Sequence, residues 1–138
     1  MSSSEVVVED IAADMVVVER DRHAVVLLCG EIDCHSGPEL RSRLLALAAS
    51  AHRPLVLDMG GVSFCDGTAL RMIAEAEREC ARRGVRMAVV GLRPFLANLF
   101  RAVGFDERLP LCRSLDEALW RLLPPTDEDI HAWLDRTP

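Results

Sequence analysis

The sequence predicts a single α/β domain, a mixed β-sheet of about five strands with about four helices. Short apolar, β-branched segments alternate with longer segments of helical periodicity along most of the chain. A short polar turn separates the first two apolar segments, which is typical of an antiparallel hairpin, whereas helices separate the later ones, as parallel strands require. The 138 residues, half of them hydrophobic, suffice for one domain with its own core.

The strands are assigned to segments rich in Val, Leu and Ile, at residues 15–19, 24–29, 54–59, 85–90 and 109–112. Gly60 and Gly61 are expected to end the third of these strands, because paired glycines favour turns. Residues 6–8 could form a further short strand within an N-terminal extension, residues 1–13, that otherwise shows weak structural signals.

The helices are assigned to residues 36–50, 67–83, 94–103 and 114–122. Ser36 with Glu39, and Ser114 with Glu117, form capping-box patterns at the starts of the first and last of these helices. Asp66 is placed to cap the second helix, since an Asp side chain at this position accepts hydrogen bonds from N–H groups of the first turn.

Composition and charge narrow the classes of function. The net charge of −6 argues against a nucleic-acid partner, which would require a concentrated basic patch. The chain has no signal-peptide pattern and no apolar run long enough for a membrane span, so a cytoplasmic location without membrane contact is expected. The five cysteines are scattered and unpaired in pattern, which favours free thiols.

The C-terminal residues 124–138 form an acidic tail after the domain at residues 14–123, with one short helix around residues 130–134. Trp120 is expected to pack beneath the last helix of the domain, whereas Trp133 could anchor a partner if it is exposed. Three further apolar side chains fit either the core or a contact surface: Met59, Phe64 and Met72.

The loop at residues 60–68 is the main candidate for function. It leads from the carboxyl end of a strand into the N-terminus of a helix, which is where α/β sheets bind ligands and partners. That helix end carries unpaired N–H groups and the positive end of the helix dipole. Taken locally, Asp66 reads first as a helix cap.

The segment Leu-Val-Leu-Asp-Met-Gly-Gly-Val-Ser-Phe-Cys-Asp-Gly-Thr-Ala-Leu, residues 55–70, resembles the signature of the STAS domain family. This family includes bacterial anti-sigma factor antagonists and the cytoplasmic tails of sulfate transporters. Further landmarks resemble the family in the right order over residues 14–123: Gly30-Glu31-Ile32-Asp33, Arg93-Pro94, Val103-Gly104-Phe105 and the closing helix at residues 114–119.

The resemblance implies an antagonist that binds a serine-kinase type of anti-sigma factor and so frees a sigma factor. The kinase phosphorylates the Ser directly after the loop Asp, and the added charge ends the binding. The residues that carry this role over to the present chain, as its partner-binding residues, are Asp33, Asp66, Gly67, Thr68 and Arg71. No motif supports an enzyme, so neither catalytic residues nor a cofactor are expected.

The chain departs from the family pattern at the phosphoacceptor. Gly67 stands where the Ser would be, Ala69 replaces a Gly, and Thr68 matches the second hydroxyl position. Three hypotheses follow: an antagonist that phosphorylation at the usual position cannot switch, a switch relocated to Thr68, or a divergent module that senses a ligand or serves as a scaffold in a stress-signalling complex. Thr68 also has a simple structural explanation, because first-turn hydroxyls bond to nearby backbone groups.

Other chemistry finds little support in the sequence. Cys34-His35 lacks the paired spacing of a zinc site, so no metal is expected. Asp33, Asp58 and Asp66 could converge at strand ends, but separate caps and turn bonds explain them better. No nucleotide-binding motif is present, and the sequence leaves the oligomeric state open.

Overall fold

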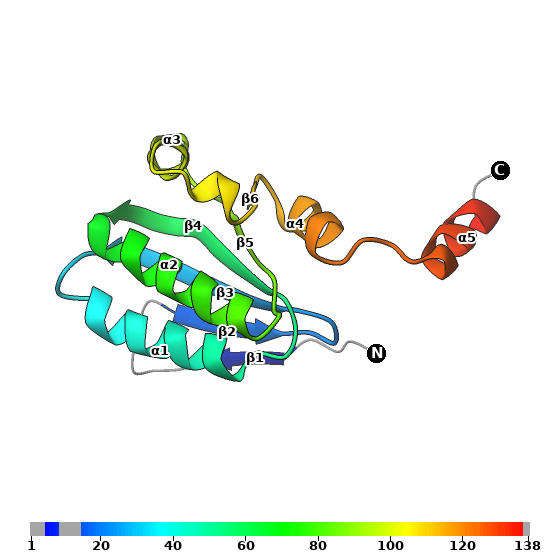
Figure 1. Ribbon diagram of the computed structural model, residues 1–138, viewed down its shortest axis with the longest axis horizontal. Helices are drawn as coiled ribbons and strands as arrows, with labels where there is room; N and C mark the ends of the chain where they lie inside the picture. The colour runs from blue at the N-terminus through cyan, green and yellow to red at the C-terminus, as the bar shows by residue number, and fades with distance from the viewer. Residues whose placement is uncertain (1–4, 9–14, 137–138) are drawn as a thin grey trace.

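The computed structural model describes residues 5–8 and 15–136, which form a six-stranded mixed sheet with helices on both faces (Figure 1). The strands are β1 (Glu5–Val8), β2 (Met15–Glu19), β3 (Ala24–Ile32), β4 (Leu55–Cys65), β5 (Met87–Val90) and β6 (Leu111–Cys112). The helices are α1 (Gly37–Ser50), α2 (Gly67–Arg82), α3 (Pro94–Ala102), the 3₁₀ turn η1 (Phe105–Glu107), α4 (Leu115–Leu122) and α5 (Asp127–Arg136).

The strand order in the sheet follows the chain, β1-β2-β3-β4-β5-β6. Strands β1, β2 and β3 pair antiparallel, and β3 to β6 pair parallel, so the predicted hairpin and mixed sheet are confirmed. Strand β1 and helix α5 coincide with the short strand and short tail helix that the sequence suggested. The rest of the N-terminal extension, residues 1–4 and 9–13, lies outside the described residues.

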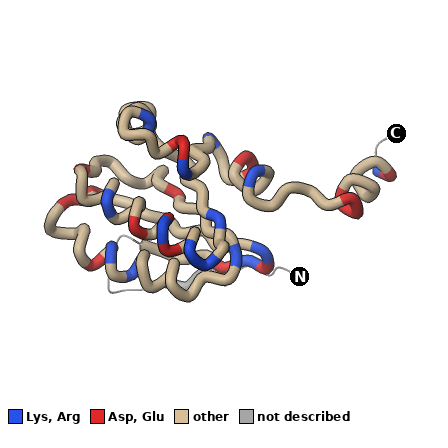
Figure 2. The backbone as a smooth tube through the Cα atoms, viewed as in Figure 1, with Lys and Arg blue, Asp and Glu red and all other residues tan. Residues whose placement is uncertain are grey.

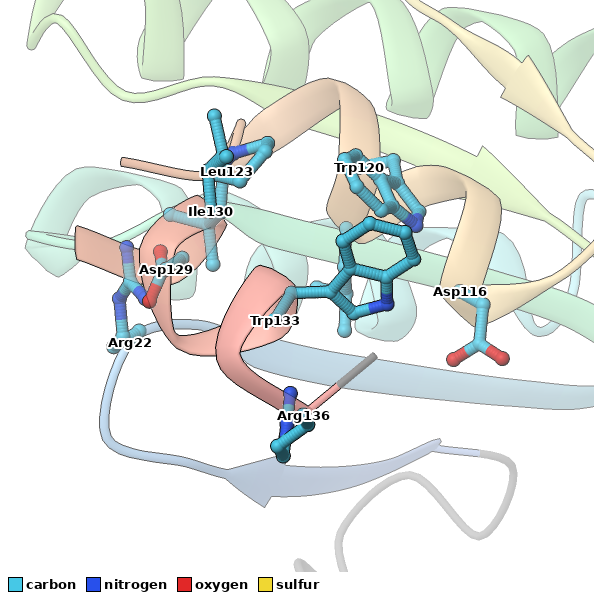
Figure 3. A pocket seen from close by; sticks show the side chains of 10 residues that line it. Arg22, Asp116, Trp120, Leu123, Asp129, Ile130, Trp133 and Arg136 are labelled. Carbon is cyan, nitrogen blue, oxygen red and sulfur yellow. The ribbon is translucent and has the colours of Figure 1, made fainter. Parts of the chain in front are cut away.

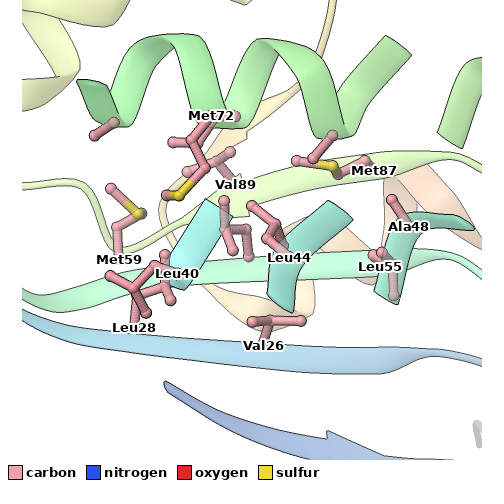
Figure 4. Close-up of a cluster of buried hydrophobic side chains, with 14 of the residues drawn as sticks. Val26, Leu28, Leu40, Leu44, Ala48, Leu55, Met59, Met72, Met87 and Val89 are labelled. Atoms are coloured by element: carbon pink, nitrogen blue, oxygen red, sulfur yellow. The ribbon is translucent and has the colours of Figure 1, made fainter. Parts of the chain in front are cut away.

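Alternate residues of the central strands face opposite sides of the sheet, as the two-residue period of a strand requires. Val26, Leu57 and Val89 pack under α1 and α2, which lie side by side on one face (Figures 1 and 4). Val56 and Ala88 point the other way, into a smaller cluster that α4 covers. Burial of each large aliphatic side chain stabilises the fold by about 1.5–3 kcal/mol.

Helix α3 is anchored to the larger core by two buried side chains, Leu96 and Phe100. The ring of Phe100 meets the ring of Phe105 edge to face, with centroids 5.3 Å apart. The helix ends before Gly104, whose φ of 85° is left-handed and suits glycine. The turn η1, which follows directly, was not predicted, because a single 3₁₀ turn leaves no periodic signal.

The expectation that Gly60 and Gly61 end the third predicted strand is wrong, since β4 continues through both to Cys65. A Cβ on Gly61 would lie 2.7 Å from the Cβ of Cys29 on the neighbouring strand. The β3–β4 pairing shifts register between Leu27 and Cys29, opposite the glycines. The glycines therefore allow close approach at an irregular pairing rather than a turn.

The capping box expected at Ser36 is also wrong. The Ser36 side chain does not cap α1; its hydroxyl donates instead to the carbonyl of Glu31, over 2.9 Å. Asp33, three residues earlier, accepts hydrogen bonds from the N–H groups of His35 and Ser36 and so shapes the turn that precedes α1. At α4 the prediction is confirmed, since Ser114 Oγ accepts from the Glu117 N–H.

Trp120 does not pack beneath the last helix of the domain, contrary to expectation. Its side chain is 64% exposed and faces α5 across a cavity (Figure 3). The buried positions of α4 are Ala118 and Leu122, four residues apart. Trp120 lies midway between these two in sequence and therefore on another side of the helix.

Candidate functional site

The candidate site lies at the carboxyl ends of β3 and β4. Ile32 and Cys65 are paired across these strands, so the residues that follow them, Asp33 and Asp66, leave the sheet at neighbouring positions. The Asp66 N–H donates to the Ile32 carbonyl over 3.3 Å, which ties the two strand ends together. The sheet thus fixes the backbone from which both Asp side chains extend.

Asp66 caps α2, as predicted. Its backbone is extended, and its Oδ1 accepts a hydrogen bond of 2.8 Å from the Thr68 N–H. The Ala69 N–H donates to the Asp66 carbonyl as the helix begins. An N-cap Asp of this kind contributes about 0.5–2 kcal/mol and orients the first turn of the helix.

Gly67 is exposed on the first turn of α2, and its position is open. A Cβ added there would meet no heavy atom within 4 Å, and Gly67 is not among the glycines with positive φ. A serine would therefore fit at this position without strain. The fold therefore does not require glycine at residue 67, although the sequence has no hydroxyl there.

Thr68 is half-buried where α2 meets α1. A Cβ added to Gly37, the first residue of α1, would lie only 2.4 Å from Thr68 Cγ2. The Thr68 methyl group is therefore directed at the start of α1, and Gly37 leaves room for it. The local hydroxyl bond expected for Thr68 is not found among the hydrogen bonds of the described residues; packing of the methyl group accounts for this side chain instead.

The Asp33 carboxylate turns back onto its own loop. Its Oδ1 accepts from the N–H groups of Ser36, at 3.1 Å, and His35, at 2.9 Å. These backbone hydrogen bonds lower the pKa of Asp33 below its usual value. The side chain is engaged in shaping the turn before α1, next to the start of α2.

Arg71 lies one turn into α2, four residues after Gly67 and therefore on the same side of the helix, and it is exposed. Glu75, one turn further on, is held by Arg41 of α1 through two hydrogen bonds of 2.6 and 3.2 Å. The hydrogen bond from Arg41 lowers the pKa of Glu75. This pair joins the two helices, so that α1 and α2 present one continuous surface beside Arg71.

Two exposed aromatic side chains flank this end of the sheet. Phe64 on β4 is 48% exposed, and Phe95 in the first turn of α3 is 69% exposed. Arg93 Nε donates to the Val62 carbonyl over 3.0 Å, which brings the start of α3 to the end of β4. Phe64 thus proves to be a surface residue, whereas Met59 and Met72, the other two ambiguous side chains, are fully buried.

The sequence reasoning missed Phe95. The signal was present, because the buried stripe of α3 runs from Leu96 to Phe100, four residues apart, and leaves Phe95 outside it. An aromatic side chain outside the buried stripe of an anchored helix is a candidate contact residue.

The remaining candidates for chemistry are structural. Asp58 Oδ1 accepts from the Gly60 N–H at 2.8 Å, so Asp33, Asp58 and Asp66 each serve a separate turn or cap, as preferred from the sequence. Within residues 5–8 and 15–136, no group of three or more His, Cys, Asp or Glu could hold a metal ion. Burial raises the pKa of the Cys80 thiol to about 11 and also raises that of Cys112.

No helix among the described residues is long and apolar enough to cross a membrane. Comparison with curated proteins finds 28% identity over 106 residues to the anti-sigma-F factor antagonist RsfA of Mycobacterium tuberculosis, covering 75% of this chain and 82% of that protein. The anti-sigma-B factor antagonist of Listeria monocytogenes is 27% identical over 92 residues, which cover 66% of this chain and 81% of the relative.

Solved structures show the same fold. An anti-sigma factor antagonist from Mycobacterium paratuberculosis superposes with a TM-score of 0.71 at 25% identity, covering 86% of this chain and 94% of the other. The anti-sigma factor antagonist SpoIIAA, in its unphosphorylated form, gives a TM-score of 0.63 at 18% identity over 80% of this chain and 99% of the other. The family model for the STAS domain matches residues 14–118, most of the sequence, and the chain therefore belongs to the STAS domain family.

Proposed function

We propose that this protein is an anti-sigma factor antagonist, which binds a serine-kinase type of anti-sigma factor in the cytoplasm and thereby frees a sigma factor. The observation that carries the proposal is the exposed first turn of α2 at the carboxyl end of the sheet, capped by Asp66 and flanked by Phe64 and Phe95. The names of the relatives, anti-sigma-F and anti-sigma-B factor antagonist, support the same role. It is a regulatory role and requires no catalytic residue.

The proposed interface has a polar centre and an apolar rim. The residues that belong to its centre are Asp33, Asp66, Gly67, Thr68 and Arg71. The N-terminus of α2 offers N–H groups and a positive dipole end, and Arg71 adds a positive charge one turn away. Phe64 and Phe95 supply the large apolar contacts that dominate binding energy in most interfaces. The partner is expected to present an acidic group to α2 and apolar pockets to the two rings.

Regulation is proposed to differ from the usual family switch. SpoIIAA has been solved in both phosphorylated and unphosphorylated forms, so a protein of this fold does carry a phosphate. Gly67 has no hydroxyl to accept one, and Thr68 is half-buried with its methyl group against α1. The protein is therefore proposed to remain competent for binding when the kinase and ATP are present.

The test incubates the purified protein with each kinase-type anti-sigma factor of the same genome and ATP. Complex formation is measured by light scattering, and added phosphate is measured by intact mass. The expected result is a complex with one of these partners and no mass increase. A phosphate mapped to Thr68 would contradict the unswitchable form of the proposal, and the absence of any complex would contradict the proposal as a whole.

A matched pair of variants makes this test specific. Gly67→Ser adds a hydroxyl in open space and is expected to gain one phosphate and then lose the complex, because about two negative charges appear at the interface. Gly67→Ala fills the same space without a hydroxyl and is expected to gain no phosphate, so any complex that it forms should persist in the presence of ATP. If no partner binds, and a small molecule copurifies with the protein or raises its melting temperature, that result would support the ligand-sensing or scaffolding alternative.

A further inference from the structure

Helix α5 is a short helix without a core of its own. None of its ten described residues is buried. Its large apolar side chains, Ile130, Trp133 and Leu134, are exposed and lie three and four residues apart, on one side of the helix. A helix of this length is marginal in water by itself and depends on the packing of its apolar side.

The apolar side of α5 continues onto α4. A cavity of about 720 Å³ separates the two helices, and the indoles of Trp120 and Trp133 face each other across it (Figure 3). Leu119, Leu123 and Ile130 add apolar lining. The two indoles are 64% and 57% exposed, so a large apolar surface meets water here, of the kind that marks interaction sites.

The charges around this surface are of both signs. Its rim carries two arginines and two aspartates: Arg22, Arg136, Asp116 and Asp129. The first turn of α5 is acidic, with Asp127, Glu128 and Asp129. Figure 2 shows Arg residues gathered at the end of the sheet that is nearer to α5. The basic end of the sheet is defined by the Arg residues that lie within four positions before the starts of β3, β4 and β5: Arg20, Arg22, Arg53, Arg83 and Arg86.

The acidic helix and the basic end of the sheet lie close together at one point. Arg22 lines the same cavity as Asp129 of α5. Hydrogen bonds from Thr126 lower the pKa of Asp129, and the charge of Arg22 lowers it further. The acidic helix and the basic end of the sheet have complementary charges and belong to one surface. An isologous interface between identical chains requires a surface that is complementary to itself in this way.

We infer that this surface, formed by α4, α5 and the basic end of the sheet, is the interface of a twofold dimer of this chain. A partner of predominantly one charge sign would be repelled by half of the rim, whereas a second copy turned about a twofold axis sets the acidic α5 of each chain against the basic end of the other. The indoles then pack in the centre and are withdrawn from water. This inference does not depend on the function proposed for the end of the sheet that bears α2.

The dimer leaves the proposed partner-binding site open. Along the long axis of the molecule, α5 lies at one extreme and the N-terminus of α2 lies toward the other (Figure 1). Both copies could therefore bind an anti-sigma factor at the same time, and a bivalent partner would bind more tightly through avidity.

The test measures the mass of the full chain in solution by light scattering and sedimentation, from about 1 to about 200 µM, a range over which a modest interface shifts by mass action. The expected mass rises toward twice 15.3 kDa with concentration. Tryptophan emission is expected to shift to shorter wavelength over the same range, because Trp120 and Trp133 are the only two tryptophans. A mass of 15.3 kDa at every concentration would overturn the inference, as would native mass spectra in which a small molecule fills the cavity of a monomer.

Two matched variants locate the interface. Trp133→Glu places a charge at its centre and is expected to weaken the dimer by about tenfold or more, as hot-spot changes do. Phe95→Glu changes an aromatic residue near the other end that is more exposed than Trp133. This variant is expected to dimerise as the natural chain does, while it weakens the binding of an anti-sigma factor. Circular dichroism verifies that both variants fold. A dimer that survives Trp133→Glu, or one lost in Phe95→Glu, would refute the assignment.

Discussion

The two ends of this molecule expose aromatic side chains to a similar degree but support them differently. At the end that bears the start of α2, Phe64 and Phe95 extend from elements that hydrogen bonds and buried side chains hold in place. At the other end, Trp120 and Trp133 flank a cavity, and α5 has no buried residue among those described. Exposure alone therefore does not distinguish a surface that is preorganised from one that is completed on binding.

The difference bears on how each end binds. At the α2 end, hydrogen bonds join β4 to β3 and α3 to β4, so a partner is expected to bind there with little ordering cost. The α5 end gains order from whatever covers it, because the short helix lacks packing of its own. Three predictions test this contrast, beyond the experiments on the two proposed interfaces.

The largest expected effect separates a buried aromatic from an exposed one. Phe100→Ala removes a fully buried ring that anchors α3 and is expected to lower the free energy of unfolding by about 3–5 kcal/mol. Trp120→Ala removes a larger ring that is mostly exposed and is expected to cost less than about 1 kcal/mol in the monomer. Urea unfolding at low protein concentration measures both. Equal losses would contradict the contrast between the two ends.

An intermediate effect is expected where α1 meets α2. Gly37→Ala brings a methyl group to 2.4 Å from Thr68 Cγ2 and is expected to destabilise the protein by about 1–3 kcal/mol through overpacking. Thr68→Ser removes that methyl group, so the double variant is expected to recover most of the loss. A double-mutant cycle of unfolding free energies measures the coupling between the two positions. Additive losses would show that the two residues do not contact each other.

The smallest expected effect is a pH dependence at Asp33. Hydrogen bonds from Ser36 and His35 lower the pKa of this carboxyl in the folded protein. Its stabilising effect is therefore present above the unfolded pKa, about 3.9, and is lost as the pH falls through the lower folded value. The difference in unfolding free energy between the natural chain and Asp33→Asn is expected to favour the natural chain at pH 7 and to shrink toward pH 3. A difference that does not change with pH would contradict this account.

Much of the fold could be predicted because its signals are local. Periodicity placed β2 at its observed bounds and α2 within one residue of its end. The Asp66 cap was predictable because Asp is one of the preferred residues directly before the first turn of a helix. The start of α2 at Gly67 was predicted from the same local pattern, whereas the open space around Gly67 was not.

What escaped prediction depends on contacts between distant segments. Gly60 and Gly61 looked like a turn, but the neighbouring strand with Cys29 sets their conformation. Ser36 looked like a cap, but its hydroxyl donates to the carbonyl of Glu31 in β3 instead. Trp120 looked like a core residue, because a hydrophobic side chain in a short helix does not reveal which side the sheet will cover.

The strand order of the sheet has a consequence for how the protein is made. Every strand pairs with the strands that precede and follow it in the chain, so no strand has to wait for a distant segment to be synthesised. The antiparallel strands β1, β2 and β3 can pair first on the ribosome, and each parallel strand can then add with the helix before it. Because α5 follows the sheet in the chain, the surface inferred to join two copies is completed only after the sheet has been synthesised, which limits premature association of unfinished chains.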